Sequence, residues 1–193
     1  MTSFDAAVAI VLRHEGGWVN DARDPGGETN FGISMRFIKA QGLDAAALGL
    51  ESLEPGCLKK LERATASGLY RRYFWDAGGY GMVADQLVAT ALFDCAVNCG
   101  LFRAAVLAQQ CLHELGASMV QVAGGTRQVT VDGKFGAITA AAINCCSQTA
   151  FRKTYRAARE RFYRDLVARK PEMKAFLKSW LHRAAWPDPP TPV

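Results

Sequence analysis

The chain has 193 residues and a formal net charge of +5, the length of one domain or of one domain with a small appended subdomain. Half of its residues are hydrophobic, so it can bury a core that folds without metals or disulfides. No stretch approaches the roughly 18 apolar residues that a membrane span needs. These properties exclude a membrane-spanning protein and favour an ordinary folded domain.

The charge is unevenly distributed along the chain. Residues 1–150 hold 12 basic and 14 acidic side chains, a net charge of −2, whereas residues 151–193 hold 11 and 4, a net charge of +7. A basic C-terminal helix favours a polyanionic partner, such as nucleic acid, an anionic lipid surface or an anionic cell wall. A solvated helix face explains the charge equally well. No helix-turn-helix, RNP or zinc-finger pattern is present, so we expect no nucleic-acid partner.

The first third of the chain predicts a helix followed by an irregular segment. Ser3 is expected to cap a helix with a 3.6-residue apolar repeat. Gly16-Gly17 ends this helix and leaves Glu15 in or just after its last turn. Residues 18–33 show no helical period and leave room for one small β-hairpin. Ser34 then opens a short helix.

The remaining two thirds predict helices joined by turns. The helices are expected over residues 57–74, 84–98, 103–115, 137–146 and 147–170, with a last one beginning at Pro171. The chain has no convincing repeat and no alternation of strands with helices. The predicted fold class is therefore mainly α.

The cysteines do not follow the spacing of a zinc site, and the chain holds only three histidines. We therefore expect no metal and no cofactor, and we interpret the cysteines as small core residues of a reduced protein. They are Cys57, Cys95, Cys99, Cys111, Cys145 and Cys146.

Glu15 lies where a carboxyl group is favoured in its protonated form. The C-terminal end of a helix carries partial negative charge, and Trp18 and Phe31 add apolar neighbours. Asp24 follows nine residues on, and Thr29 five residues after that. A proton donor, a second carboxylate and a hydroxyl that orients water are the groups a glycosidase uses. On pattern alone, an acidic glycine-rich surface loop remains an equal alternative.

Five segments in chain order carry a resemblance to a known family. They are "HEGGWVNDARDPGGETNFGIS", "YRRYFWDA", "ALFDCAVNCG", "VDGKFGAIT" and "FLKSWLHR". They resemble the motifs of glycoside hydrolase family 108 and of the peptidoglycan-binding region joined to it, with Ser179 in place of the usual glycine before Trp180. The matches span nearly 170 residues, and together they are specific although each alone is weak.

The resemblance implies a lysozyme-like helical fold and an N-acetylmuramidase, as in phage or prophage endolysins and their bacterial relatives. Such an enzyme cleaves the β-1,4 bond between N-acetylmuramic acid and N-acetylglucosamine. Glu15 matches the family's catalytic glutamate. The arrangement with Asp24 and Thr29 is similar to that of phage-type lysozymes, although its second gap is one residue shorter, so the roles of these two residues stay open.

The resemblance also implies an organisation and a partner. We expect residues 1–100 to form the lysozyme-like catalytic region, and residues 101–193 to form a helical peptidoglycan-binding region packed on it as one compact unit. The expected partner is bacterial peptidoglycan, bound by a monomer. The basic C-terminal helix is expected to contact an anionic wall or membrane surface.

Further residues are candidates for substrate binding. Gly27 lets the backbone approach a bulky ligand, and Glu28 is a reserve acid or a loop hydrogen-bonding group. Asn98 shares a helix face with Asp94, so it either binds sugar or forms a buried polar pair with that residue.

The aromatic residues Tyr73, Trp75 and Trp180 are suited to stack on sugar rings. Aromatic side chains at helical spacing are, however, more often part of a core, so both roles stay open for all three.

Two other functions remain open from the sequence. One is a lytic transglycosylase, which uses one dominant glutamate and leaves a 1,6-anhydro sugar, so that Asp24 is dispensable. The other is a catalytically silent wall-binding or secretion-assisting module.

The N-terminus lacks the pattern of a signal peptide. We therefore expect synthesis in the cytoplasm, and action in the periplasm or on the cell wall after holin-type release or through a dedicated secretion system.

Overall fold

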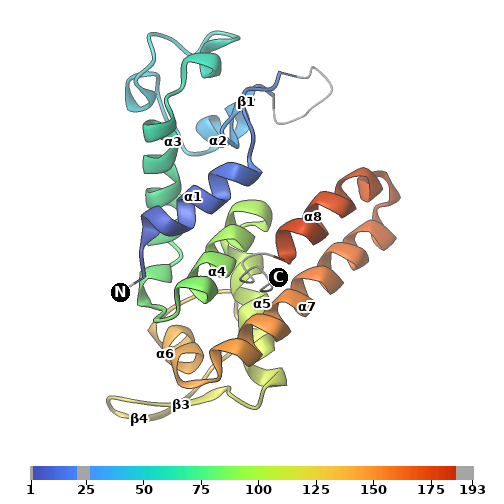
Figure 1. Ribbon diagram of the computed structural model, residues 1–193. Helices are drawn as coiled ribbons and strands as arrows, with labels where there is room; N and C mark the ends of the chain where they lie inside the picture. The colour runs from blue at the N-terminus through green and yellow to red at the C-terminus, as the bar shows by residue number, and fades with distance from the viewer. Residues whose placement is uncertain (1, 21–26, 186–193) are drawn as a thin grey trace, which may run out of the picture. The chain divides into compact units, whose positions relative to one another are not determined.

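The computed structural model describes residues 2–20 and 27–185, and its helices and strands are shown in Figure 1. It divides into two compact units. The first, Val8–Arg72, is called the Glu15 unit. The second, Met1–Ala7 with Tyr73–Val193, is called the C-terminal unit. Helices dominate the described residues and the strands form two short antiparallel pairs, so the predicted mainly α class is confirmed.

Helix α1 (Phe4–His14) begins where the sequence predicts. The hydroxyl of Ser3 accepts a hydrogen bond from the amide of Ala6 at 3.3 Å, which satisfies one of the open donors of the first turn. The buried side chains of α1 recur with the helical repeat, and its last residue is His14.

The predicted hairpin near residues 18–33 is confirmed as strands β1 (Thr29–Asn30) and β2 (Ile33–Ser34) of the Glu15 unit. The two residues between the strands both have positive φ, 49° for Phe31 and 76° for Gly32. This is the backbone of a type I′ turn, whose twist matches that of paired strands. Thr29 is also bridged to Val19.

The rest of the Glu15 unit is built from short helices. Helix α2 (Met35–Ala40) is capped by Ser34, as predicted, and is followed by the 3₁₀ turn η1 (Ala46–Leu48). The expected single helix over residues 57–74 is wrong. The structure has a 3₁₀ turn η2 (Cys57–Lys60), helix α3 (Arg63–Tyr70) and the π-helical turn η3 (Arg71–Asp76).

The break between η2 and α3 lies at Leu61. Leu61 turns its side chain into the core and takes an extended backbone with ψ of 126°, so the chain leaves the helical conformation there. The next residue, Glu62, has ψ of 145° and serves as the N-cap of α3.

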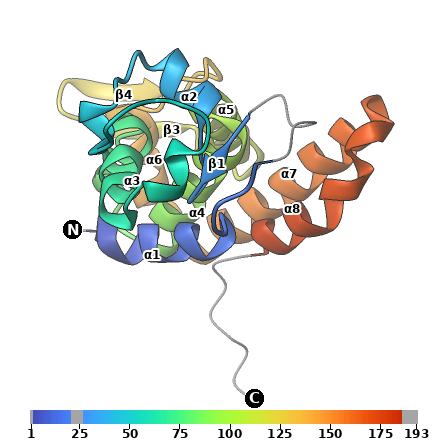
Figure 2. The ribbon, with the colours of Figure 1, turned by 90° about the horizontal axis from the view of Figure 1, so that it is seen from above.

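The C-terminal unit is a packed group of helices. After the 3₁₀ turn η4 (Tyr80–Met82) come α4 (Gln86–Cys99), α5 (Leu101–Glu114), α6 (Ala137–Cys145), α7 (Gln148–Arg169) and α8 (Leu177–Ala184). Helix α4 packs on α5 and α7, and α8 lies beside α7 (Figures 1 and 2). Gly100, with φ of +86°, separates α4 from α5.

Two elements of the C-terminal unit were not expected. Strands β3 (Met119–Val122) and β4 (Gly125–Gln128) form a hairpin in which only Val120 is buried, so the segment lacks the apolar alternation that predicts strands. Pro171 opens a 3₁₀ turn η5 (Pro171–Phe176), and α8 begins only after it.

No helix among the described residues is long and apolar enough to cross a membrane. Of the six cysteines, only Cys95 and Cys111 are fully buried, and burial raises the pKa of the Cys111 thiol to about 12. Their interpretation as core residues is therefore confirmed. The same interpretation is wrong for Cys145, whose side chain is exposed.

Candidate active site

Glu15 is the first residue after α1, and its amide donates to the carbonyl of Val11 at 3.2 Å. The sequence predicted this place at the helix end. The carboxyl group reaches the turn of the β1–β2 hairpin, because a Cβ built on Gly32 would lie only 2.5 Å from Oε2 of Glu15. The carboxylate thus occupies the space that a side chain at position 32 would need.

The buried hydroxyl of Tyr70 reaches the same turn. It donates to the carbonyl of Phe31 at 2.9 Å and would also collide with a Cβ at Gly32. Glu15, the hairpin turn and α3 therefore meet at one place in the Glu15 unit. Sequence reasoning missed Gly32 and Tyr70, although the "NFGI" turn and the aromatic cluster near residue 70 were their signals.

Glu28 holds three segments of the Glu15 unit together. Its side chain is buried, with 6% of the residue exposed, and both carboxylate oxygens accept hydrogen bonds. Nε1 of Trp18 donates at 2.7 Å and the amide of Gly56 at 2.8 Å. The Lys59 ammonium lies 5.6 Å from the centre of the Trp18 ring. Through these hydrogen bonds, Glu28 holds the loop in place between Trp18 and Gly56.

Thr29 and Gly27 are the neighbours of Glu28 in the chain. The backbone of Thr29 exchanges two hydrogen bonds with Val19, at 2.8 and 2.9 Å, and its hydroxyl donates to the carbonyl of Gly27 at 3.2 Å. Gly27 has φ of +71°, a conformation that favours glycine. Asp24, the third predicted catalytic residue, lies outside the described residues.

The other predicted binding residues belong to the C-terminal unit. Trp75 is 5% exposed and packs edge-on against Phe4, Tyr80 and Phe93, with ring centres 5.5 to 6.3 Å apart. This packing corresponds to the core alternative. Tyr73 precedes it in η3 and is partly exposed.

Asn98 and Trp180 are joined through a third residue. Nδ2 of Asn98 donates to the hydroxyl of Tyr163 at 2.6 Å, and the Tyr163 ring stacks on Trp180 at 5.3 Å. Trp180 also stacks on Phe176 at 5.7 Å. Phe176 is 52% exposed, so this aromatic stack reaches the surface of α8 and η5.

Asp94 forms a buried ion-pair cluster with two arginines. Its Oδ2 accepts from Arg159 of α7 at 2.6 Å, and its Oδ1 from Arg183 of α8 at 2.7 Å. Burial alone would lower the pKa of Arg159, but the Asp94 carboxylate raises it well above its ordinary value. The "FD" motif of α4 and the "WLHR" motif of α8 therefore meet at this cluster.

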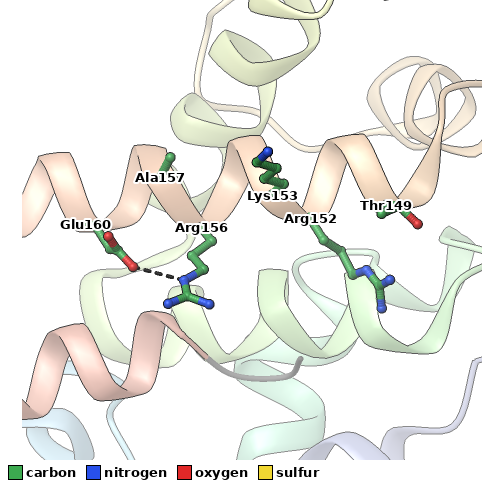
Figure 3. Close-up of a pocket in the computed structure, with 6 residues that line it drawn as sticks. All are labelled: Thr149, Arg152, Lys153, Arg156, Ala157 and Glu160. Atoms are coloured by element: carbon green, nitrogen blue, oxygen red, sulfur yellow. Dashed lines mark hydrogen bonds and ion pairs between the residues drawn. The ribbon is translucent and has the colours of Figure 1, made fainter. Parts of the chain in front are cut away.

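A basic pocket lies along α7 and has a volume of about 450 Å³ (Figure 3). Arg152, Lys153 and Arg156 line it, with Thr149, Ala157 and Glu160, and Arg156 pairs with Glu160 at 2.9 Å. Part of the basic charge of the C-terminal region is thus on the surface. Another part, at Arg159, is buried and paired.

Among residues 2–20 and 27–185, no group of three or more histidine, cysteine, aspartate or glutamate side chains is arranged to hold a metal ion. The candidate site consists of the Glu15 carboxyl, the hairpin turn and the loop held by Glu28.

Comparison with known proteins gives two family matches and a structural one. Residues 8–100 match the family model described as Glycosyl hydrolase 108, and residues 103–185 match the model described as Predicted Peptidoglycan domain. The chain is similar to the solved structure of Brucella abortus SagA, with a TM-score of 0.70 and 25% sequence identity, over 94% of this chain and 89% of that chain. The comparison with curated proteins found no match.

Proposed function

Because the chain belongs to glycoside hydrolase family 108 and carries a peptidoglycan-binding region, we propose that this peptidoglycan hydrolase is an N-acetylmuramidase with Glu15 as its general acid. It cleaves the β-1,4 bond between N-acetylmuramic acid and N-acetylglucosamine. The observation that carries the proposal is the place of the Glu15 carboxyl, at a helix end and against the turn of the β1–β2 hairpin. A general acid has to be held at the glycosidic oxygen in this way.

In this reaction Glu15 donates its proton to the leaving glycosidic oxygen, and water adds to the anomeric carbon. Asp24 either stabilises the positive charge that develops on the sugar or activates the water. Thr29 orients that water from its strand. Glu28 acts as a positioning residue, because both of its oxygens already accept hydrogen bonds.

The remaining predicted residues have supporting roles in the proposal. Gly27 allows the loop to approach the glycan closely. In the C-terminal unit, Tyr73 contacts the sugar. Further sugar contacts come from the stacked rings of Tyr163, Trp180 and Phe176 and from Asn98, which is hydrogen-bonded to Tyr163. Trp75 is part of the core of this unit. The basic pocket of α7 contacts an anionic wall or membrane surface.

Replacing Gly32 by alanine tests the position of Glu15. The added methyl group meets the Tyr70 hydroxyl and Oε2 of Glu15, and we expect the displaced carboxyl to lower hydrolysis of purified peptidoglycan by about 100-fold, as displacements of about 1 Å do. The positive φ should also cost about 1 to 3 kcal/mol of stability.

Gly42 supplies the matched control for this substitution. It lies in the same unit with φ of +63°, but nothing lies within 4 Å of a Cβ built there. Gly42→Ala should therefore carry the backbone cost while activity is kept. Equal activity losses in the two variants would show that the contact between Gly32 and Glu15 is unimportant.

The alternative reaction is that of a lytic transglycosylase. Both carboxylate oxygens of Glu28 accept hydrogen bonds, whereas the Glu15 carboxyl lies at the hairpin turn. Dependence on Glu15 as the dominant acid favours this reaction. In that reaction the 6-hydroxyl of the muramic acid replaces water, and Asp24→Asn should keep full activity.

Mass spectrometry of muropeptides released in ¹⁸O-labelled water distinguishes the functions. A muramidase yields reducing ends that carry one ¹⁸O atom, whereas a transglycosylase yields unlabelled 1,6-anhydro ends. Binding to sacculi with no released product would identify a silent wall-binding or secretion-assisting module and overturn the proposal.

We further propose a monomer that is synthesised in the cytoplasm, as for an endolysin of a phage or prophage. It reaches the wall by holin-type release, or alternatively through a dedicated secretion system. A holin or secretion gene beside its own gene would support the corresponding route.

A further inference from the structure

The turn before α6 is held by one buried side chain. Gln109, 1% exposed, donates from Nε2 to Oδ1 of Asp132 at 2.8 Å and to the carbonyl of Lys134 at 3.0 Å. Its Oε1 accepts from the amide of Gly133 at 2.9 Å. The amide of Lys134, and then Gln109, hold the pKa of the Asp132 carboxyl below its usual range. These hydrogen bonds therefore fix the shape of the turn and favour the ionised form of the Asp132 carboxyl.

A pocket of about 300 Å³ lies between this turn, the end of β4 and the first turn of α6. Its lining includes Gln128, Asp132, Lys134, Ile138 and Thr139. The volume is at the lower end of the range for small-molecule sites and suits two or three amino-acid residues.

The first turn of α6 offers hydrogen-bond donors to this pocket. The N-cap of this nine-residue helix is Gly136, which has no side chain to cap it, and the first backbone bond of the helix runs from Ala140 to the Gly136 carbonyl at 3.0 Å. The amides of Ala137 and Ile138 therefore lack an intrahelical acceptor. A helix start of this kind favours an anion.

Thr139 points independently to a ligand. Only 4% of the residue is exposed, and its hydroxyl has no hydrogen bond to any other described residue. Thr139 lines the pocket, and side chains of a helix tilt toward its N-terminus, where the turn borders the pocket. The hydroxyl of a residue that lines the pocket can form a hydrogen bond to a molecule bound there.

The surrounding residues select the kind of anion. Lys134 brings a cation to the pocket, and Ile138, which is 39% exposed, brings an apolar surface. The ionised Asp132 disfavours a dianion such as phosphate, but it can accept from the N–H groups of a peptide. A peptide chain end, with one carboxylate, amides and small apolar side chains, fits this combination.

We infer that this pocket binds the C-terminal carboxylate of a peptidoglycan stem peptide, through the first amides of α6 and the Thr139 hydroxyl, beside Lys134. The inference rests on peptidoglycan as the substrate. Ile138 contacts the methyl group of the terminal alanine. Binding of this kind directs the enzyme to glycan strands that carry free peptides.

The test is an NMR titration of the ¹⁵N-labelled full chain with diacetyl-L-Lys-D-Ala-D-Ala, which has a single carboxylate. We expect amide shifts at Ala137, Ile138 and Thr139 with this peptide and none with its C-terminal amide. Thr139→Val keeps the shape of the side chain and should weaken binding about tenfold or more, because it removes a hydrogen bond to a charged group. Lys134→Gln should weaken it as well.

Lys153→Gln is the matched control, since Lys153 lies on the rival basic pocket of α7 (Figure 3). Weaker binding in Lys153→Gln alone, equal binding of the peptide amide, or shifts with inorganic phosphate at the same amides would each overturn the inference.

The titration involves no catalysis, so the two proposals can fail separately. Muramidase products without peptide binding reject only the pocket, and peptide binding without muramidase products rejects only the reaction.

Discussion

Glu15→Gln is expected to lower the rate of peptidoglycan hydrolysis by about 100- to 10,000-fold, the usual contribution of a positioned general acid. Glutamine has nearly the same shape as glutamate but cannot donate the proton that the leaving oxygen needs. Because the side chain still fits beside Gly32, the fold and the affinity for sacculi should be unchanged. The rate is measured as turbidity loss of purified peptidoglycan, with circular dichroism to monitor the fold.

Glu51→Gln is the matched control. It makes the same chemical change in the same unit, but its side chain is 93% exposed and its salt bridge to Lys60 is long, at 3.7 Å. A surface pair of this kind contributes little, so activity should be kept. Full activity of Glu15→Gln would remove Glu15 from the mechanism and with it the proposed reaction.

Asp94→Asn is expected to cost about 3 to 5 kcal/mol of unfolding free energy, the largest stability effect that we predict for a single substitution. The carboxylate is the shared partner of Arg159 and Arg183, and all three side chains are buried. Asparagine leaves two buried guanidinium groups facing a neutral amide. Urea denaturation followed by circular dichroism measures the loss.

The loss of unfolding free energy should be smaller for an ion pair that is partly exposed. Glu160→Gln breaks the partly exposed pair with Arg156 on the same helix α7, and should cost less than about 1 kcal/mol. A loss below 1 kcal/mol for Asp94→Asn would mean that the cluster does not hold α4, α7 and α8 together.

Local signals in the sequence predicted much of the helical structure. Ser3, Ser34 and Ser147 each open a helix where the sequence predicts one, and each accepts with its side-chain hydroxyl a hydrogen bond from the amide three residues on. Caps and apolar periodicity act within one or two turns, so they can be recognised without knowledge of the fold.

Tertiary contacts decided where these signals failed. Leu61 interrupts the expected helix over residues 57–74 because its side chain is needed in the core. The β3–β4 hairpin went unpredicted because it buries only Val120. The boundary near residue 100 between the catalytic and binding regions stays a prediction, as do the roles of Asp24 and Thr29.

For the candidate site, the sequence by itself determined the family, the mainly α class and the place of Glu15 at the end of a helix. Only the tertiary structure decided that Gly32 and Tyr70 adjoin Glu15, that Glu28 holds the loop in place and that Asp94 faces two arginines. The physical reason is distance along the chain. Glu28 meets Gly56 across 28 residues, and Asp94 meets Arg183 across 89, separations over which no local pattern carries information.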